Sequence, residues 1–155
     1  MRRAKPEKRE ILPDVRYNSI TLQTMVQHVL KRGKKSLAVG LIYDAMDIIK
    51  ERTGKNAMDV FDTALKNVSP AMEVRPRRVG GATYQVPMEV PSTRRFALAS
   101  RWLLQASRAR SGRSFSEKLA GELVDAANNQ GSAIRKREDT HKMAESNRAF
   151  SHYRV

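Results

Sequence analysis

The chain has 155 residues, enough for one domain with a modest core and short for two independently folded ones. Its 30 Lys and Arg outnumber its 16 Asp and Glu, and the resulting net charge of +14 exceeds what solubility requires, so we expect a polyanionic partner. An aromatic content of 6% disfavours a surface that stacks many unpaired bases, and the absence of Cys excludes disulfides, thiolate nucleophiles, zinc ribbons and iron–sulfur sites.

Membrane insertion and secretion are not expected either. No segment approaches the roughly 18 consecutive apolar residues of a membrane span. The basic residues 1–9 are followed by no apolar stretch of signal-peptide length. We therefore expect a soluble intracellular protein with no membrane partner.

The first half of the chain predicts an extended arm followed by three helices. Residues 1–16 contain two prolines and no sustained periodicity, which predicts an extended basic N-terminal arm. Apolar residues then recur at the i, i+3, i+4 spacing of amphipathic helices within residues 22–30, 37–49 and 60–68. Gly33 is placed to end the first of these helices and Gly54 the second. Asn56 is a good N-cap for the third, which has to end before Pro70.

Residues 72–90 change to an apolar period of two and predict a β-hairpin that turns at Gly80 and Gly81. A two-residue turn pairs Val74 with Pro87, which puts the apolar alternations of the two strands on different faces. A register shifted by one residue places Pro76 and Pro87 on opposite pair types, so one of them would sit where an N–H is needed. We therefore expect a β-bulge near residues 86 and 87, which an unbroken ladder would refute.

Three further helices are expected after the hairpin. Ser92 is a good cap for a fourth helix, and Ser114 with Glu117 has the capping-box spacing for a fifth, which Gly131 would close. A more polar sixth helix should run from about residue 133 to 148, before a docked or mobile tail over residues 149–155. The buried face of the fourth helix should consist of Phe96, Ala99, Trp102, Leu103 and Ala106.

The predicted fold class is therefore mostly α. We expect a single domain over residues 1–155 with about six helices and one protruding β-hairpin arm, residues 72–90, between helices three and four.

The sharpest basic cluster lies on the predicted hairpin. Arg75, Arg77 and Arg78 occupy the strand that leads to the Gly-Gly tip, and arginine binds phosphate through two parallel hydrogen bonds. A solvated hairpin with an ordinary basic surface is the alternative. Against it, an isolated two-stranded ribbon is only marginally stable in water, so we expect this one to lean on a partner.

A second basic surface is expected along the fourth helix. Arg94, Arg101 and Arg108 are spaced by seven residues and share one stripe, and no acidic residue lies between Arg94 and Arg113. A solvated face explains one such arginine, but three in register favour a stripe that faces phosphates. Lys34 and Lys35 are a weaker signal. The segment 135–137 is followed by two acidic residues, so internal pairing is an equal alternative to RNA contact there.

Neither a catalytic set nor a metal site is predicted. The sequence lacks a G-x-S-x-G motif, a P-loop, an H-E-x-x-H motif and a dinucleotide-binding fingerprint. His28, His141 and His152 are scattered, with no carboxylate cluster at metal-ligand spacing. We therefore expect a protein that is not an enzyme and uses no cofactor and no metal.

Segments along nearly the whole chain resemble the bacterial small-subunit ribosomal protein seven family. The residues that carry the resemblance are Gly33-Lys34-Lys35, residues 41–45, the arm from Met72 to Val90, Arg101-Trp102-Leu103, residues 143–145 and His152-Tyr153-Arg154. The resemblance implies six helices with a hairpin between the third and the fourth, in agreement with the periodicity.

The resemblance also implies a function. Such proteins are structural constituents of the small ribosomal subunit that bind the 3′ major domain of 16S rRNA and nucleate assembly of the head. Their arm looks toward the exit-site tRNA and the mRNA path, with small-subunit proteins nine and eleven as neighbours. The implied location is the small subunit, in the cytoplasm or in a plastid stroma. Some also bind their own mRNA as repressors, which no residue here decides.

Carried onto this sequence, the family's RNA-binding surface would use basic residues of the arm, the first turn, the hairpin and the fourth helix. The rRNA-binding residues would be Arg2, Arg3, Lys5, Lys8, Arg9, Lys34, Lys35, Arg75, Arg77, Arg78, Arg94, Arg95, Arg101, Arg108 and Arg113. The part nearest tRNA and mRNA would be the tip, Val79, Gly80, Gly81, Ala82, Thr83 and Tyr84.

Two other classes of protein remain open at this point. An architectural DNA-binding protein can also send a proline-bearing basic hairpin from a helical body into the minor groove, although no dimer seam is evident here. An RNA-modifying enzyme would need a cofactor pocket. Competition between duplex DNA and structured RNA distinguishes the DNA-binding class from an RNA-binding protein. Soaking with S-adenosylmethionine or nucleotides would reveal the cofactor pocket of an enzyme.

Overall fold

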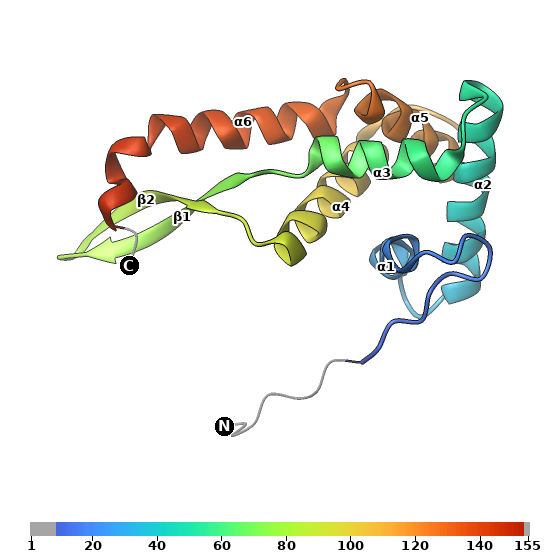
Figure 1. Ribbon diagram of the computed structural model, residues 1–155, viewed down its shortest axis with the longest axis horizontal. Coiled ribbons are helices and arrows are strands. Elements are labelled where there is room, and N and C mark those ends of the chain that lie inside the picture. Colours follow the sequence, from blue (N-terminus) through green and yellow to red (C-terminus); the bar gives the residue numbers. More distant parts are fainter. Residues whose placement is uncertain (1–8, 154–155) are drawn as a thin grey trace. The chain divides into compact units, whose positions relative to one another are not determined.

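The computed structural model describes residues 9–153 (Figure 1). The chain divides into two compact units, residues 1–40 and residues 41–155. The expectation of a single domain over residues 1–155 stays a prediction.

The N-terminal unit contains helix α1 (Ile20–Val29) and the start of helix α2 (Lys35–Thr53). The buried Asp14 carboxylate accepts the backbone N–H groups of Arg16 and Tyr17, at 3.1 and 3.0 Å, and so forms a turn before α1. Ser19 caps α1 by accepting the N–H of Leu22 at 3.3 Å. The predicted arm therefore gives way to a fixed turn by residue 14.

Gly33 does not end the first helix, contrary to prediction. Helix α1 stops at Val29, because Leu30 already leaves the helical conformation with ψ at 126°. Gly33 lies farther on, in the turn before α2, where it and Arg32 both take positive φ angles, 74° and 52°. Gly54, with φ at 66°, follows the end of α2 as predicted.

The second unit contains the rest of α2, α3 (Ala57–Val68), strands β1 (Met72–Val79) and β2 (Ala82–Glu89), α4 (Ser92–Ala109), α5 (Phe115–Ala127), α6 (Ser132–Ser146) and the 3₁₀ helix η1 (Arg148–Tyr153). Asn56 caps α3 through the N–H of Met58, at 3.1 Å, as predicted. The predicted fold class, mostly helical with one hairpin between helices three and four, is confirmed.

Two further predicted helix ends, both in the second unit, are wrong. Ser92 is the first residue of α4 and not its cap; Pro91 precedes it, and its carbonyl accepts the N–H groups of Arg94 and Arg95. Gly131 does not close α5, because Asn129 already supplies the left-handed residue, with φ at 56°. Gly131 instead precedes α6. The Ser114 cap of α5 is confirmed by its hydrogen bond from the N–H of Glu117, at 3.1 Å.

The core of the second unit lies among α3, α4, α5 and α6, which contact one another. Its largest fully buried side chains in these helices are Phe61, Leu103, Leu119, Leu123 and Ile134. The predicted face of α4 is buried except for Phe96, which is half-buried, and Leu98 and Leu104 are buried as well. Helix α4 contacts three other helices, so its apolar face is wider than one amphipathic stripe.

The hairpin forms an unbroken antiparallel ladder, so the predicted β-bulge is wrong. The register runs without interruption from Met72 opposite Glu89 to Val79 opposite Ala82. The N–H of Val90 donates to the carbonyl of Ala71 at 3.0 Å, which fixes which pairs exchange hydrogen bonds. By that alternation Pro76 and Pro87 both fall in non-hydrogen-bonded pairs, where no N–H is missed. No bulge is needed.

The base and one edge of the hairpin lean on the C-terminal part of the chain. Helix α6 runs alongside β1, and η1 folds back onto β2 (Figure 1). The N–H of Ala71 donates to Nε2 of His141 in α6, at 3.0 Å. The Tyr84 ring stacks on Tyr153 at a centroid distance of 4.9 Å. Residues 149–153 of the predicted tail are therefore docked, and they supply part of the support that a two-stranded ribbon needs.

Candidate nucleic-acid interface

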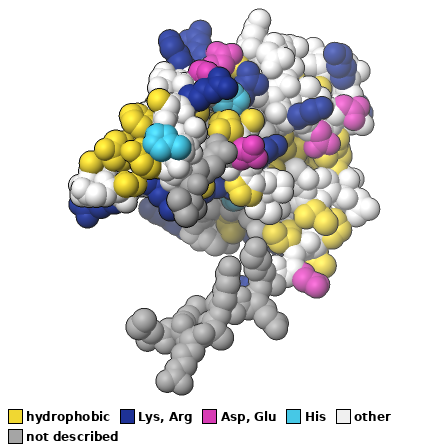
Figure 2. Space-filling model, turned by 60° about the vertical axis from the view of Figure 1, so that its left-hand side comes forward, with side chains coloured by type: hydrophobic (Ala, Val, Ile, Leu, Met, Phe, Trp, Pro, Cys, Tyr) yellow, Lys and Arg dark blue, Asp and Glu magenta, His cyan; other side chains and the backbone are white. Residues whose placement is uncertain are grey.

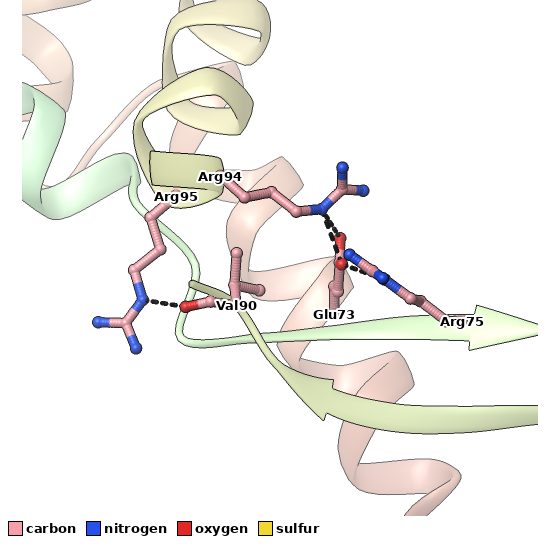
Figure 3. Close-up of polar contacts among 5 residues, drawn as sticks. All are labelled: Glu73, Arg75, Val90, Arg94 and Arg95. Carbon is pink, nitrogen blue, oxygen red and sulfur yellow. Dashed lines mark hydrogen bonds and ion pairs between the residues drawn. The ribbon is translucent and has the colours of Figure 1, made fainter. Parts of the chain in front are cut away.

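A buried carboxylate joins two of the predicted RNA-binding arginines at the base of the hairpin. Glu73 Oε1 accepts the Nε–H of Arg75 at 2.6 Å and that of Arg94 at 2.8 Å (Figure 3). Arg94 Nε also lies 2.9 Å from Glu73 Oε2. The Glu73 side chain is 9% exposed, whereas those of Arg75 and Arg94 are 46% and 44% exposed. The structure thus brings a strand arginine and a helix arginine together.

Arg95, the next residue of α4, also uses its Nε–H for a contact near the base of the hairpin. Its Nε–H donates to the backbone carbonyl of Val90 at 2.8 Å. In Figure 3 the terminal nitrogens of Arg94 and Arg95 point away from the oxygens that their Nε atoms contact. The inner edge of Arg94 therefore joins α4 to β1, the inner edge of Arg95 fixes the junction between β2 and α4, and the outer edges face away from these contacts.

The remaining arginines of the α4 stripe are exposed. Arg101 and Arg108 continue the stripe begun by Arg94, and Arg113 follows the end of the helix. The first turn of α4 holds no acidic residue, and within the described residues no side chain caps this end. The positive end of the helix dipole and the arginine stripe therefore both contribute positive potential along α4. Figure 2 shows Lys and Arg side chains at several places on the face that it presents.

The tip of the hairpin is open to solvent. Residues 79–83 are exposed, and Tyr84 is half-buried against η1. Gly80 and Gly81 have φ angles of 58° and 88°, as the tight primed turn requires. Arg77 and Arg78 are exposed on the strand just before the turn. Directly paired residues share a face, so Arg77 lies with Tyr84 and Arg78 with Thr83 on opposite faces of the ribbon.

The other predicted residues are less informative. Arg9, Lys34 and Lys35 are exposed in the N-terminal unit. Arg2, Arg3, Lys5 and Lys8 lie outside the described residues.

Some basic residues of the second unit are tied into the fold. Arg110 Nη1 lies 2.6 Å from Asp125 and 3.0 Å from the buried Glu122, and the hydrogen bond with Asp125 is the main cause that raises the pKa of Arg110. Arg137 donates through Nη1 to the carbonyl of Asn67, so the segment 135–137 is partly internal, whereas Arg135 and Lys136 are exposed.

Sequence reasoning missed Glu73. The apolar alternation that predicted β1 rested on Met72 and Val74, yet Glu73 between them is the buried residue. A carboxylate two residues before an arginine on a strand is a local signal of such a pair. The second arginine, from a helix 21 positions away, has no local signal.

Neither a metal centre nor a membrane span is found in the described part of the chain. Residues 9–153 contain no group of three or more His, Cys, Asp or Glu that could hold a metal ion. None of the described helices has the length and hydropathy to cross a membrane. An open hollow of about 370 Å³ lies between the hairpin base and α6, lined by residues that include Met72, Pro87, His141 and Glu145.

A stripe of exposed arginines on a hairpin and the helix that follows it is the electrostatic footprint of a surface that binds nucleic acid. The sequence matches the family described as "Ribosomal protein S7p/S5e" over residues 1–148. It is 58% identical over 153 residues to "Small ribosomal subunit protein uS7" of Thermomicrobium roseum, covering 99% of this chain and 98% of the relative. The protein of the same name from Chloroflexus aurantiacus is 56% identical over 98% and 97% of the two chains, and that of Prochlorococcus marinus 59% over 99% and 98%.

The chain belongs to the ribosomal protein S7p/S5e family. It is therefore a structural constituent of the small ribosomal subunit that binds small-subunit rRNA, and it is not an enzyme. The family membership that the sequence resemblance predicted and the predicted location in the small subunit are both confirmed.

Proposed function

We propose that this chain binds the 3′ major domain of 16S rRNA and nucleates assembly of the head of the small subunit, with the hairpin tip near the exit-site tRNA and the mRNA path. Small-subunit proteins nine and eleven are its proposed neighbours, and its own mRNA is a further candidate ligand. The observation that carries the proposal is the run of exposed arginines from β1 through α4, in which no acidic residue interrupts Arg94 to Arg113.

Binding is proposed to work through phosphates and RNA shape. Lys and Arg displace counterions from the RNA backbone, and the outward edges of the guanidiniums suit bidentate contact with phosphate. The residues proposed to contact rRNA are the basic ones predicted from the sequence, and the tip residues 79–84 are proposed to lie nearest tRNA and mRNA. Specificity then comes mainly from how several RNA segments fit the hairpin and α4 at once.

The test is binding of the full chain to an isolated transcript of the 16S 3′ major domain across a salt series. A scrambled RNA and a duplex DNA of equal length are the controls. We expect a preference for the transcript that persists at about 0.2 M salt, where purely nonspecific phosphate binding collapses. Equal binding to all three nucleic acids would contradict the proposal. Preference for the duplex would favour the architectural DNA-binding alternative.

A further inference from the structure

We propose that Arg75 and Arg94 form a single binding site for one RNA backbone phosphate, and that Glu73 is the residue that positions them. The inference rests on the proposed rRNA binding and names one contact within it.

The two guanidiniums are held next to each other by a shared oxygen atom. Both Nε atoms contact Glu73 Oε1, at 2.6 and 2.8 Å, although Arg75 comes from β1 and Arg94 from α4. Two guanidiniums bound to one oxygen atom repel each other, and the attraction of each to the carboxylate offsets that repulsion. The carboxylate is inside and the two cations are outside, as their exposed fractions show.

The contact through Nε leaves the Nη nitrogens of Arg94 for a ligand, and the Arg75 side chain beside it is 46% exposed. Each guanidinium has five N–H donors in a fixed planar fork, of which the Nε contact uses one. The Nη atoms of Arg94 point away from Glu73 (Figure 3). A phosphodiester has two non-bridging oxygens, so it can accept hydrogen bonds from both arginines at once. The cluster carries two positive charges and one negative charge, so it still attracts an anion.

Glu73 makes this site more than two flexible arginines. A free arginine side chain loses rotamer entropy when it is fixed, and that cost is normally met at binding. Here the buried carboxylate fixes both side chains beforehand. An RNA phosphate would therefore meet donors already in place, at a point where strand β1 and helix α4 are joined.

The direction in which one substitution changes the affinity for RNA distinguishes positioning by Glu73 from an effect of net charge alone. Glu73→Gln raises the net charge by one and keeps the side-chain shape, so binding governed by charge alone would stay the same or tighten. Positioning predicts weaker binding, because the amide no longer holds two cations on one oxygen. Glu89→Gln is the matched control, since Glu89 is an exposed residue on the same hairpin and its replacement changes the charge equally.

A second substitution separates a phosphate site from a merely structural ion pair. Arg94→Lys keeps a cation for Glu73, and so keeps the hairpin anchored, but its ammonium cannot contact the carboxylate and also offer a planar pair of donors to phosphate. Arg52→Lys in α2 is the matched control, because Arg52 is exposed and outside the predicted surface. Hydrogen exchange of the hairpin amides shows whether each variant leaves the arm ordered.

The experiment measures binding of the full chain and these four variants to the 3′ major-domain transcript across a salt series. We expect Glu73→Gln and Arg94→Lys to bind about tenfold more weakly, with a salt dependence shallower by about 0.8, the loss of one phosphate contact. Arg52→Lys should match the wild type, and Glu89→Gln should bind as tightly as the wild type or slightly more tightly because of its added charge. Glu73→Gln binding as tightly as Glu89→Gln, or Arg94→Lys as tightly as Arg52→Lys, would overturn the site.

Binding of the wild-type chain to the transcript is by itself the test of the proposed function. If the unmodified chain binds the transcript no better than a scrambled RNA, the proposed function fails, and this site fails with it. If the wild type prefers the transcript and the variants match their controls, only the shared phosphate site is overturned.

Discussion

The base and the tip of the hairpin belong to one continuous ladder, yet they are stabilised in different ways. At the base, Glu73 is bound by two arginines, Val86 is fully buried and Ala71 is bonded to His141. At the tip, residues 79–83 are exposed and the chain turns through two glycines. The base therefore belongs energetically to the folded body, whereas the tip is held mainly by its own ladder and is open to a partner.

The largest expected effect comes from the same substitution made at the two ends. Val86→Ala removes two methyl groups from a side chain with 0% exposure and should lower the free energy of unfolding by about 2 kcal/mol. Val79→Ala, at a residue that is 40% exposed, should change it by less than about 0.5 kcal/mol. Urea unfolding of both variants measures the difference. Equal losses would mean that the tip is as much a part of the fold as the base.

The next effect concerns binding and should leave stability unchanged. Replacing Arg77 and Arg78 together with Ala should weaken binding to the 3′ major-domain transcript roughly tenfold and make its salt dependence shallower by about 1.6, two phosphate contacts. Both side chains are exposed near the tip, so the free energy of unfolding should stay within about 0.5 kcal/mol. Arg52→Ala with Lys55→Ala removes the same charge elsewhere as a control. Unchanged affinity and slope would show that the tip does not contact the RNA.

The smallest expected effect is a pH dependence of stability that comes from His141 at the base of the hairpin. Burial, and to a lesser extent the charge of Arg137, lower the pKa of His141 below its usual value of 6.5. The unfolded chain therefore binds a proton before the folded chain does, so stability is lost as pH falls from about 6.5 through the folded pKa. Protonation also removes the lone pair that accepts the N–H of Ala71.

The variant His141→Gln should show a smaller loss of unfolding free energy than the wild type between pH 7.5 and 5.5. Glu145 and Arg148 line the same hollow as His141 and stay in both proteins, so their contribution cancels in the comparison. An identical loss in both proteins would assign the pH dependence to other groups.

Local patterns predicted the elements well, and failed where distant parts of the chain decide the outcome. Apolar periodicity located the helices, and Asn56 and Ser114 cap the helices predicted for them. Ser92 was a plausible cap by composition, but the Pro91 carbonyl begins α4 one residue earlier. Asn129 took the left-handed position expected of Gly131. Helix ends of this kind depend on how the connecting loop packs.

The hairpin shows the same limit. The two-residue turn and its register follow from the Gly-Gly pair, but the apolar mismatch between the strands led to the wrong prediction of a bulge. The mismatch is accommodated because the polar residue that faces inward, Glu73, meets Arg94 from α4. The exposed arginines of the site were predictable from charge and spacing. The contact between Glu73 and Arg94 was not, since 21 positions separate these two residues in the sequence.

The two prolines of the ladder also limit how the hairpin can pair with strands of other molecules while no partner is bound to it. In non-hydrogen-bonded pairs the backbone amides face outward, toward the open edge of each strand. Pro76 removes one such donor from the edge of β1, and Pro87 removes one from the edge of β2. Neither edge can therefore be extended by a full strand from another molecule. Before a partner covers the arm, its edges are therefore protected against pairing with strands of other molecules.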